Sequence, residues 1–392
     1  MASRTRLIVL LVSTPLLVFV VIGGFLGARA QTPPQTMEQS LRVFEDVVSL
    51  IVHNYVEDVN VDKVMDGAMR GLADGLDPDS AYLHAAQVRA LDAGEKLPAG
   101  DVGIDLTRQY YLRVVAAREG SPAARAGLMP GDFVRAIDGK PTRDLSVYEG
   151  SRLLHGAPGT KVSLVLIRGN AADPHVVDLV REEPRPVAMT SRLVNGTVGY
   201  IRIPAFEQGT AAQLRKQIAD LAKSGASKLV IDVRQTTDGP LESGLAAAGV
   251  FLPPGTTVAM KATRDDKKTP VTSDATGEPI ALPSVVLTNF GTSGAAELFA
   301  SALAGNDRAK TVGEHTNGRA GLQKLVRLPQ GAGLWLTHAT FTTPKGDPIH
   351  EKGLTPAVEV EEPEIEFGRA AEPNAKDPVL EKALEVLGAN PA

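Results

Sequence analysis

The chain has 392 residues, a formal net charge of −5 and no cysteine. This length is sufficient for two or three domains with hydrophobic cores, and the lack of thiols excludes disulfides, cysteine nucleophiles and zinc–thiolate sites. Aromatic residues make up only 4% of the chain and there is no long basic run, so no nucleic-acid partner is expected. The sequence has neither HExxH spacing nor a glycine-rich nucleotide loop, so we expect no metal and no cofactor.

The N-terminus has the features of an export signal. Arg4 and Arg6 precede an apolar run at residues 7–26, and Ala28-Arg29-Ala30 matches the A-x-A pattern that signal peptidase reads. A run of this length is also long enough to span a bilayer. We therefore expect an exported protein of the periplasm or cell envelope. It is either cleaved after Ala30 or anchored in the inner membrane through residues 7–26.

Residues 37–98 are predicted to form a helical N-terminal region. Apolar side chains recur with a helical period over residues 41–55, and a second helix fits residues 61–76. Asp77-Pro78 marks a turn at the end of the second helix.

The sequence pattern changes at residues 99–183, where short β-like segments alternate with glycine and proline turns. One helix fits residues 146–155, and Glu183-Pro184-Arg185-Pro186 forms a linker to the next unit. We predict a mostly-β domain here. Its expected strands are residues 102–106, 112–116, 133–137 and 162–167.

Strands alternate with helices at residues 187–361, which predicts an α/β domain whose sheet is covered by helices. Gly331 to Gly333 is expected to form a hairpin turn, and residues 362–392 form a charged tail with a short helix. The expected strands are residues 198–203, 228–233 and 284–288. The expected helices are residues 210–224, 241–252, 295–303 and 378–387.

The 99–183 segment carries three motifs in order: Gly120-Ser121-Pro122-Ala123-Ala124, Ala126-Gly127-Leu128-Met129-Pro130-Gly131-Asp132 and Ile137-Asp138-Gly139. With them it resembles a PDZ domain of the kind inserted in tail-processing proteases. Such domains add a peptide as a strand to a sheet edge and bind its carboxylate with backbone N–H groups. The resemblance places that carboxylate loop at Val102-Gly103-Ile104-Asp105. Asp101 stands where the family usually has glycine, and its negative charge is expected to oppose an incoming carboxylate.

The flanking segments resemble the carboxyl-terminal processing proteases, which are serine peptidases of the S41 type. The resemblance covers about residues 40–361 and implies an α/β core of the crotonase or Clp-protease-like kind. To this core are added an inserted mostly-β PDZ domain and a helical N-terminal region. The motifs that carry it are Gly75-Leu76-Asp77-Pro78-Asp79-Ser80-Ala81-Tyr82-Leu83, Asp232-Val233-Arg234, Gly313-Glu314, Thr342-Thr343-Pro344-Lys345-Gly346 and Lys352-Gly353-Leu354-Thr355-Pro356.

The resemblance also locates the working residues of a Ser–Lys dyad. Glu297 matches the family's glutamate at the start of a helix, and counting back from it places Gly294 at the nucleophile position. The lysine position, 25 residues further on, is Arg319, and the glutamine four beyond it is retained as Gln323. Glycine has no nucleophilic side chain, and a guanidinium stays protonated. The resemblance therefore implies a catalytically degenerate member that lacks peptidase activity.

The oxyanion region departs from the family as well. Asp238 replaces one of its paired glycines, next to the retained Gly239, and we expect Asp238 to pair with Arg319. A carboxylate there would repel a developing oxyanion.

Three functions stay open. The preferred one is an exported pseudoprotease that binds protein C-terminal peptides or a partner protein. The second is an active serine endopeptidase that uses Ser293, next to the nucleophile position, with a base such as His315. The third is a structural envelope protein whose PDZ groove is degenerate too.

Overall fold

The computed structural model describes residues 36–169, 173–265, 267–363 and 376–388, and the chain divides into two compact units, residues 1–68 and 69–392. The predicted export signal at residues 1–30 lies outside the described residues. None of the described helices is long and apolar enough to cross a membrane.

The first unit contains α2 (Met37–Asn54) and the start of α3 (Val61–Asp74). The side chain of Thr36 caps α2, and Gln39 completes a capping box, which fixes where the helix begins. Both predicted N-terminal helices are thus present.

A six-stranded antiparallel sheet forms the mostly-β domain in the second unit, with the order β2-β3-β4-β6-β7 and with β5 paired to β4. The four expected strands are present, and β7 was not predicted. β2 lies at the edge of this sheet and has β3 as its strand partner, while α6 packs beside β2. The elements are β2 (Ile104–Gln109), β3 (Tyr111–Ala117), α5 (Pro122–Arg125), β4 (Phe133–Ile137), β5 (Lys140–Pro141), α6 (Val147–Leu154), β6 (Lys161–Ile167) and β7 (His175–Val180).

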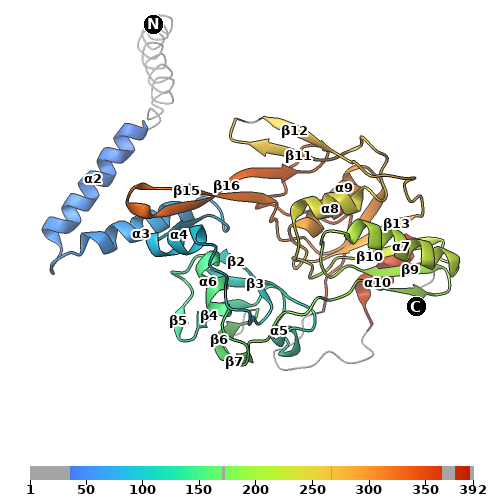
Figure 1. The fold of residues 1–392 in the computed structure, drawn as a ribbon, viewed down its shortest axis with the longest axis horizontal. Coiled ribbons are helices and arrows are strands. Elements are labelled where there is room, and N and C mark those ends of the chain that lie inside the picture. The colour runs from blue at the N-terminus through green and yellow to red at the C-terminus, as the bar shows by residue number, and fades with distance from the viewer. Residues whose placement is uncertain (1–35, 170–172, 266, 364–375, 389–392) are drawn as a thin grey trace, which may run out of the picture. The chain divides into compact units, whose positions relative to one another are not determined.

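The α/β domain is built on a second six-stranded sheet, with the order β17-β14-β13-β10-β9-β8. Figure 1 labels three of its strands, β13, β10 and β9. Its neighbouring strands are parallel except for β8, which is antiparallel to β9. The expected strands over residues 198–203, 228–233 and 284–288 are confirmed as β9, β10 and β13. The bounds are β8 (Thr190–Val194), β9 (Val198–Arg202), β10 (Lys228–Asp232), β13 (Ser284–Thr288), β14 (Ala309–Gly313) and β17 (Val358–Glu359).

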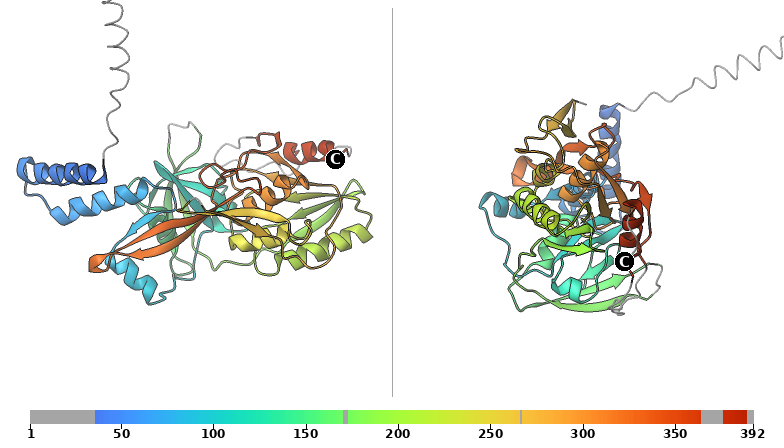
Figure 2. Two further views of the ribbon diagram at one scale, coloured as in Figure 1. Left: turned by 90° about the horizontal axis from the view of Figure 1, so that it is seen from above. Right: turned by 90° about the vertical axis from the view of Figure 1, so that its right-hand side faces the viewer.

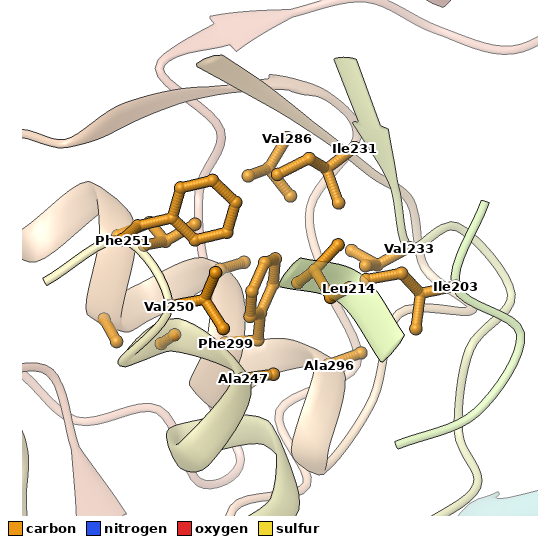
Figure 3. Packing of buried hydrophobic residues seen from close by; sticks show 14 of the residues in the cluster. Ile203, Leu214, Ile231, Val233, Ala247, Val250, Phe251, Val286, Ala296 and Phe299 are labelled. Atoms are coloured by element: carbon orange, nitrogen blue, oxygen red, sulfur yellow. The ribbon is translucent and has the colours of Figure 1, made fainter. Parts of the chain in front are cut away.

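Helices cover both faces of this sheet because its strands are apolar on both sides. Ile231 of β10 packs into the cluster formed with α7, α8 and α9, whereas its neighbour Val230 packs with α10 on the other face. Figure 2 shows α10 across the sheet from α7, and Figure 3 shows Phe299 of α9 between Phe251 and Leu214 in the larger cluster. The helices are α7 (Thr210–Lys223), α8 (Leu241–Ala248), α9 (Ala295–Gly305) and α10 (Pro378–Val386).

A third sheet, with the order β1-β16-β11-β12 and with β15 paired to β16, was not predicted as strands. The predicted turn at Gly331 to Gly333 does join β15 to β16, and Figure 1 shows this hairpin reaching from the α/β domain to α4. The elements are β1 (Ala81–Leu83), α4 (Ala85–Asp92), β11 (Thr257–Thr263), β12 (Lys268–Thr272), β15 (Gly321–Arg327), η1 (Pro329–Gly331) and β16 (Gly333–Thr342).

Candidate functional site

The predicted nucleophile position lies in a sharp turn between β13 and α9, which we call the 289–294 turn. Gly294 is the N-cap of α9, with φ 61° and ψ −117°. A positive φ of this size favours glycine, and a strained strand-to-helix turn is also how α/β hydrolases expose a nucleophile. A Cβ added at Gly294 would meet no atom closer than Leu241 Cδ2, at 3.5 Å. The turn therefore has room for a small side chain but carries none.

One buried carboxylate holds this turn in place. Glu297 is fully buried and accepts hydrogen bonds from the backbone N–H groups of Gly294 (3.0 Å), Gly318 (2.6 Å) and Arg319 (2.7 Å), and from Thr316 Oγ1. Burial raises the pKa of Glu297, while these four donors act in the opposite direction. The carboxylate thus joins the two segments that carry the predicted dyad positions. In the sequence, Glu297 set only the register of the dyad positions, although its place in the first turn of α9 is where capping boxes occur.

Arg319 fixes a positive charge at the predicted general-base position. Its Nη2 forms an ion pair with Asp79 Oδ1 at 2.8 Å, and its Nη1 donates to the Leu106 carbonyl of β2 at 3.4 Å. Burial alone would lower the pKa of Arg319, but the charges of Asp79 and Asp105 outweigh it and hold the pKa above its ordinary value. The guanidinium is therefore charged and cannot accept a proton from a hydroxyl.

The expected Asp238–Arg319 pair is wrong. Asp238 Oδ2 accepts instead from Arg118 Nε at 2.9 Å, and Arg319 pairs with Asp79. Each charge has a nearer partner than the one expected, because the loop after β3 brings Arg118 to Asp238. The neighbouring Thr237 Oγ1 donates to the half-buried Asp105, whose pKa is raised by desolvation and by the charge of Asp238.

The two retained family residues have structural contacts of their own. Gly239 has φ 117°, and a Cβ there would lie 2.6 Å from the Phe206 carbonyl carbon, so only glycine fits. Gln323 Nε2 donates to Thr337 Oγ1 across the β15–β16 hairpin at 3.2 Å. Its described hydrogen bond is therefore not directed at Arg319.

Ser293 and His315 do not meet in the described part of the chain. Ser293 is 2% exposed, and its backbone N–H donates to the Thr236 carbonyl at 3.0 Å. The ring of His315 contacts the Thr316 carbonyl through Nδ1 at 2.9 Å and lies against Gly353. Within the described residues, no contact joins the hydroxyl to this imidazole.

The predicted carboxylate loop at residues 102–105, which we call the 102–105 loop, is bounded by Asp101. Asp101 Oδ1 accepts from the backbone N–H of Val102 at 2.6 Å, and its Oδ2 accepts from Arg118 Nη1 at 3.1 Å. Arg118 compensates the negative charge of Asp101, so charge alone opposes an incoming carboxylate less than the sequence predicts. Gly103 has φ 74° and packs against Ser121, which leaves no room for a side chain there.

A cavity of about 330 Å³ lies beside Arg319, between the end of β2 and the 315–319 segment. Its wall includes Asp79, Phe290, His315 and Lys352. No group of acidic and histidine residues in the described ranges could hold a metal ion. The cavity therefore offers charged and aromatic contacts to a ligand.

Comparisons with known proteins add to this geometry. The profile of peptidase family S41 matches residues 197–360, and that of a PDZ domain matches residues 113–168. The chain is 31% identical over 365 residues to a carboxy-terminal-processing protease of Bartonella bacilliformis, covering 88% of this chain and 82% of that protein. It is 29% identical over 348 residues to the carboxy-terminal processing protease CtpA of Bacillus subtilis, covering 87% and 72%. The solved structure of a photosystem II D1 C-terminal processing protease aligns with a TM-score of 0.68 and 25% identity, covering 82% and 92%.

Proposed function

The chain belongs to the carboxyl-terminal processing proteases of peptidase family S41 and carries a PDZ domain, and from this premise we propose that it is a pseudoprotease that binds polypeptides without cleaving them. Its ligands are proposed to be protein C-terminal segments or a partner protein.

The observation that carries this proposal is that a glycine, Gly294, and a charged arginine, Arg319, stand at the two predicted dyad positions. Acyl transfer by a Ser–Lys dyad needs a hydroxyl to attack the carbonyl and a neutral amine to take its proton. Gly294 supplies no hydroxyl, and Asp79 holds the guanidinium of Arg319 in its charged form. Nucleophilic attack and proton abstraction thus each lack the side chain that the family reaction needs. Glu297 still holds the backbone at both positions.

Polypeptide binding is supported by the PDZ domain. β2 lies at the edge of its sheet and packs beside α6, which is the arrangement that adds a peptide as a further strand. A PDZ domain and a protease-like cleft in one chain supply two surfaces for extended polypeptide.

An active endopeptidase that uses Ser293 is the alternative. Its hydroxyl would have to reach a substrate carbonyl, and a base would have to lie within hydrogen-bond distance. Ser293 is 2% exposed and His315 contacts Thr316 and Gly353, so the geometry favours the pseudoprotease.

We further propose that the protein is exported, on the basis of Arg4, Arg6 and the apolar run at residues 7–26. The same run is proposed to tether the protein to the inner membrane if the chain is not cleaved after Ala30.

The proposal is tested by incubating the full chain with an unfolded model protein that ends in a free apolar carboxy-terminus. We expect no cleavage by the parent chain. The variant Gly294→Ser/Arg319→Lys is expected to cleave at least about 100-fold faster than the parent, because it regains both a nucleophile and an ionisable amine. The single variants are the matched controls, and each is expected to stay silent.

Cleavage by the parent chain would contradict the proposal. If that cleavage disappeared in Ser293→Ala, the nucleophile would have moved by one residue. Binding is measured separately, as retention of the same unfolded protein on the immobilised parent chain.

A further inference from the structure

The backbone of the 102–105 loop is held rigidly on both sides. The Val102 carbonyl accepts from the Ala123 N–H at 3.0 Å, and the Gly103 carbonyl accepts from the Arg118 N–H at 2.8 Å. Asp101 and Glu182 exchange two backbone hydrogen bonds of 2.9 Å each. The loop therefore cannot move away from the side chain of Asp101 without breaking several of these bonds.

Asp101 places its own carboxylate on this loop. Its Oδ1 accepts from the Val102 N–H at 2.6 Å, and the side chain is 8% exposed. A backbone N–H has one hydrogen to donate, so a ligand carboxylate can use the Val102 N–H only after Asp101 has left. Occupation of this donor is a stronger obstacle than charge alone, because Arg118 already neutralises the charge.

The neighbouring cation, Arg118, already has two carboxylate partners within the chain. Arg118 donates to Asp101 through Nη1 at 3.1 Å and to Asp238 through Nε at 2.9 Å. The single positive charge of Arg118 is thus already shared by two carboxylates of the chain itself, which weakens its attraction for a third.

β2 lies at the edge of its sheet with β3 as its strand partner, and its Leu106 carbonyl accepts from Arg319. Strand addition depends on backbone N–H and C=O groups along the edge and on side-chain pockets, and neither requires a chain end. A segment from the middle of an extended polypeptide meets these requirements, and it brings no terminal carboxylate to compete with Asp101.

We propose that the Asp101 side chain takes the place of a ligand carboxylate on the 102–105 loop. The PDZ domain of this chain therefore selects internal extended segments of polypeptides rather than C-terminal tails. This inference rests on the proposed function as a polypeptide-binding pseudoprotease. Of the two ligands named there, it keeps a partner protein, bound through an internal extended segment, and sets C-terminal segments aside for the PDZ domain.

The test uses the full chain in detergent and fluorescein-labelled octapeptides with Ala, Val, Leu, Ile or Phe as the last residue. Each peptide is made as a free acid and as a C-terminal amide, and each sequence is also embedded in the middle of a 20-residue peptide. Binding is measured by fluorescence anisotropy. We expect the wild-type chain to bind the amide and embedded forms at least as tightly as the free acid.

Two variants distinguish the effect of occupying the Val102 N–H from the effect of the negative charge of Asp101. Asp101→Gly frees the Val102 N–H and is expected to bind the free acid at least tenfold more tightly than the amide. Asp101→Asn removes the charge but keeps a side-chain oxygen for the same N–H, so its preference is expected to stay within about threefold. Thermal unfolding of each variant verifies that it is folded.

A wild-type preference of tenfold or more for the free acid overturns the inference, while the proposed function stands. An Asp101→Gly variant with no gain for the free acid also overturns it, as does an Asp101→Asn variant that gains as much as Asp101→Gly. If the wild-type chain binds none of the peptides but Asp101→Gly binds the free acid, the selection of internal segments is overturned, because the parent chain then binds neither kind of segment.

Discussion

A Cβ added at Gly294 meets no atom closer than 3.5 Å, whereas one added at Gly103 lies 2.7 Å from Ser121 Oγ and closer still to its Cβ. Both glycines have a positive φ, and both stand in segments that the family resemblance makes functional. The 289–294 turn has space and lacks a side chain. The 102–105 loop has its backbone donors, and an adjacent side chain occupies one of them.

Under the two proposals, the segments depart from their family roles in opposite directions. The turn would regain its role by adding a hydroxyl, and the loop would regain its role by removing a carboxylate. In both, buried polar contacts hold the backbone: Glu297 receives four donors at the turn, and Asp101 and Glu182 exchange backbone bonds beside the loop. The proposed loss of chemistry thus leaves the backbone contacts of both segments in place.

The largest effect is expected when the support of the turn is removed. Glu297→Ala leaves three backbone N–H groups and the Thr316 hydroxyl without their acceptor in a fully buried place. We expect the free energy of unfolding to fall by about 4 kcal/mol, because each buried donor left unsatisfied costs about 1–3 kcal/mol and relaxation recovers part of the sum. Urea denaturation measures this change.

Ser301→Ala is the matched control for that prediction. Ser301 lies on the same helix, α9, and its buried Oγ has no hydrogen-bond partner among the described residues. Its removal is expected to change the free energy of unfolding by less than about 0.5 kcal/mol or to raise it. Equal losses for the two variants would contradict the role given to Glu297.

The comparison of the two glycines predicts unequal costs for the same substitution. Gly103→Ala is expected to lower the free energy of unfolding by about 3 kcal/mol, since strain at positive φ adds to overlap with Ser121. Gly294→Ala suffers only the backbone strain and is expected to lose about 1 kcal/mol. Urea denaturation of both variants under the same conditions measures the difference. Equal losses in the free energy of unfolding would show that the 289–294 turn has no room for a side chain at Gly294.

Strong local patterns predicted much of the fold. The apolar runs at residues 133–137 and 284–288 are β4 and β13 with those same bounds, and the helices at residues 210–224 and 295–303 are α7 and α9. The hairpin of β15 and β16 was recognised only by its turn. Most of its residues are half-exposed, so apolar side chains mark no buried face, and its pairing depends on β1 and β11, which lie elsewhere in the chain.

The positions of the candidate site residues could be predicted where their spacing along the sequence identifies them. Gly294 and Arg319 follow from their distances to Glu297 in the sequence, and their assignment to the dyad stays a prediction from that spacing. The partners of charged side chains were not predictable. Arg319 finds Asp79 and Asp238 finds Arg118 through tertiary packing, which no local pattern encodes.

A further prediction concerns the pH dependence of the variant Gly294→Ser/Arg319→Lys. The carboxylate of Asp79 is only 7% exposed and would favour the charged form of the introduced lysine, which raises the pKa of that lysine. The neutral amine is the active form, so cleavage should rise only toward alkaline pH. Adding Asp79→Asn is expected to move the midpoint of this rise about one pH unit lower. The measurement is the rate of cleavage against pH.

Asp92→Asn in the same background is the control, because it removes an equal charge from the surface pair with Arg327. It is expected to move the midpoint by less than about 0.2 units, since exposed charges are screened. A midpoint that does not move in Asp79→Asn would mean that the introduced lysine does not take the place of the Arg319 guanidinium.

The smallest effect concerns Arg118, whose guanidinium joins Asp101 beside the loop to Asp238 in the oxyanion region. A double-mutant cycle of Arg118→Gln and Asp238→Asn is expected to give a coupling of about 0.5–1 kcal/mol in urea denaturation, because both side chains are partly exposed, at 25% and 38%. The pair Arg125–Glu182, with both side chains about half exposed, is the control and should couple less strongly. A coupling above about 2 kcal/mol would exceed what a partly exposed pair supplies. It would mean that the 102–105 loop and the predicted oxyanion region are energetically coupled. A value in the expected range means that each segment can regain its role independently of the other.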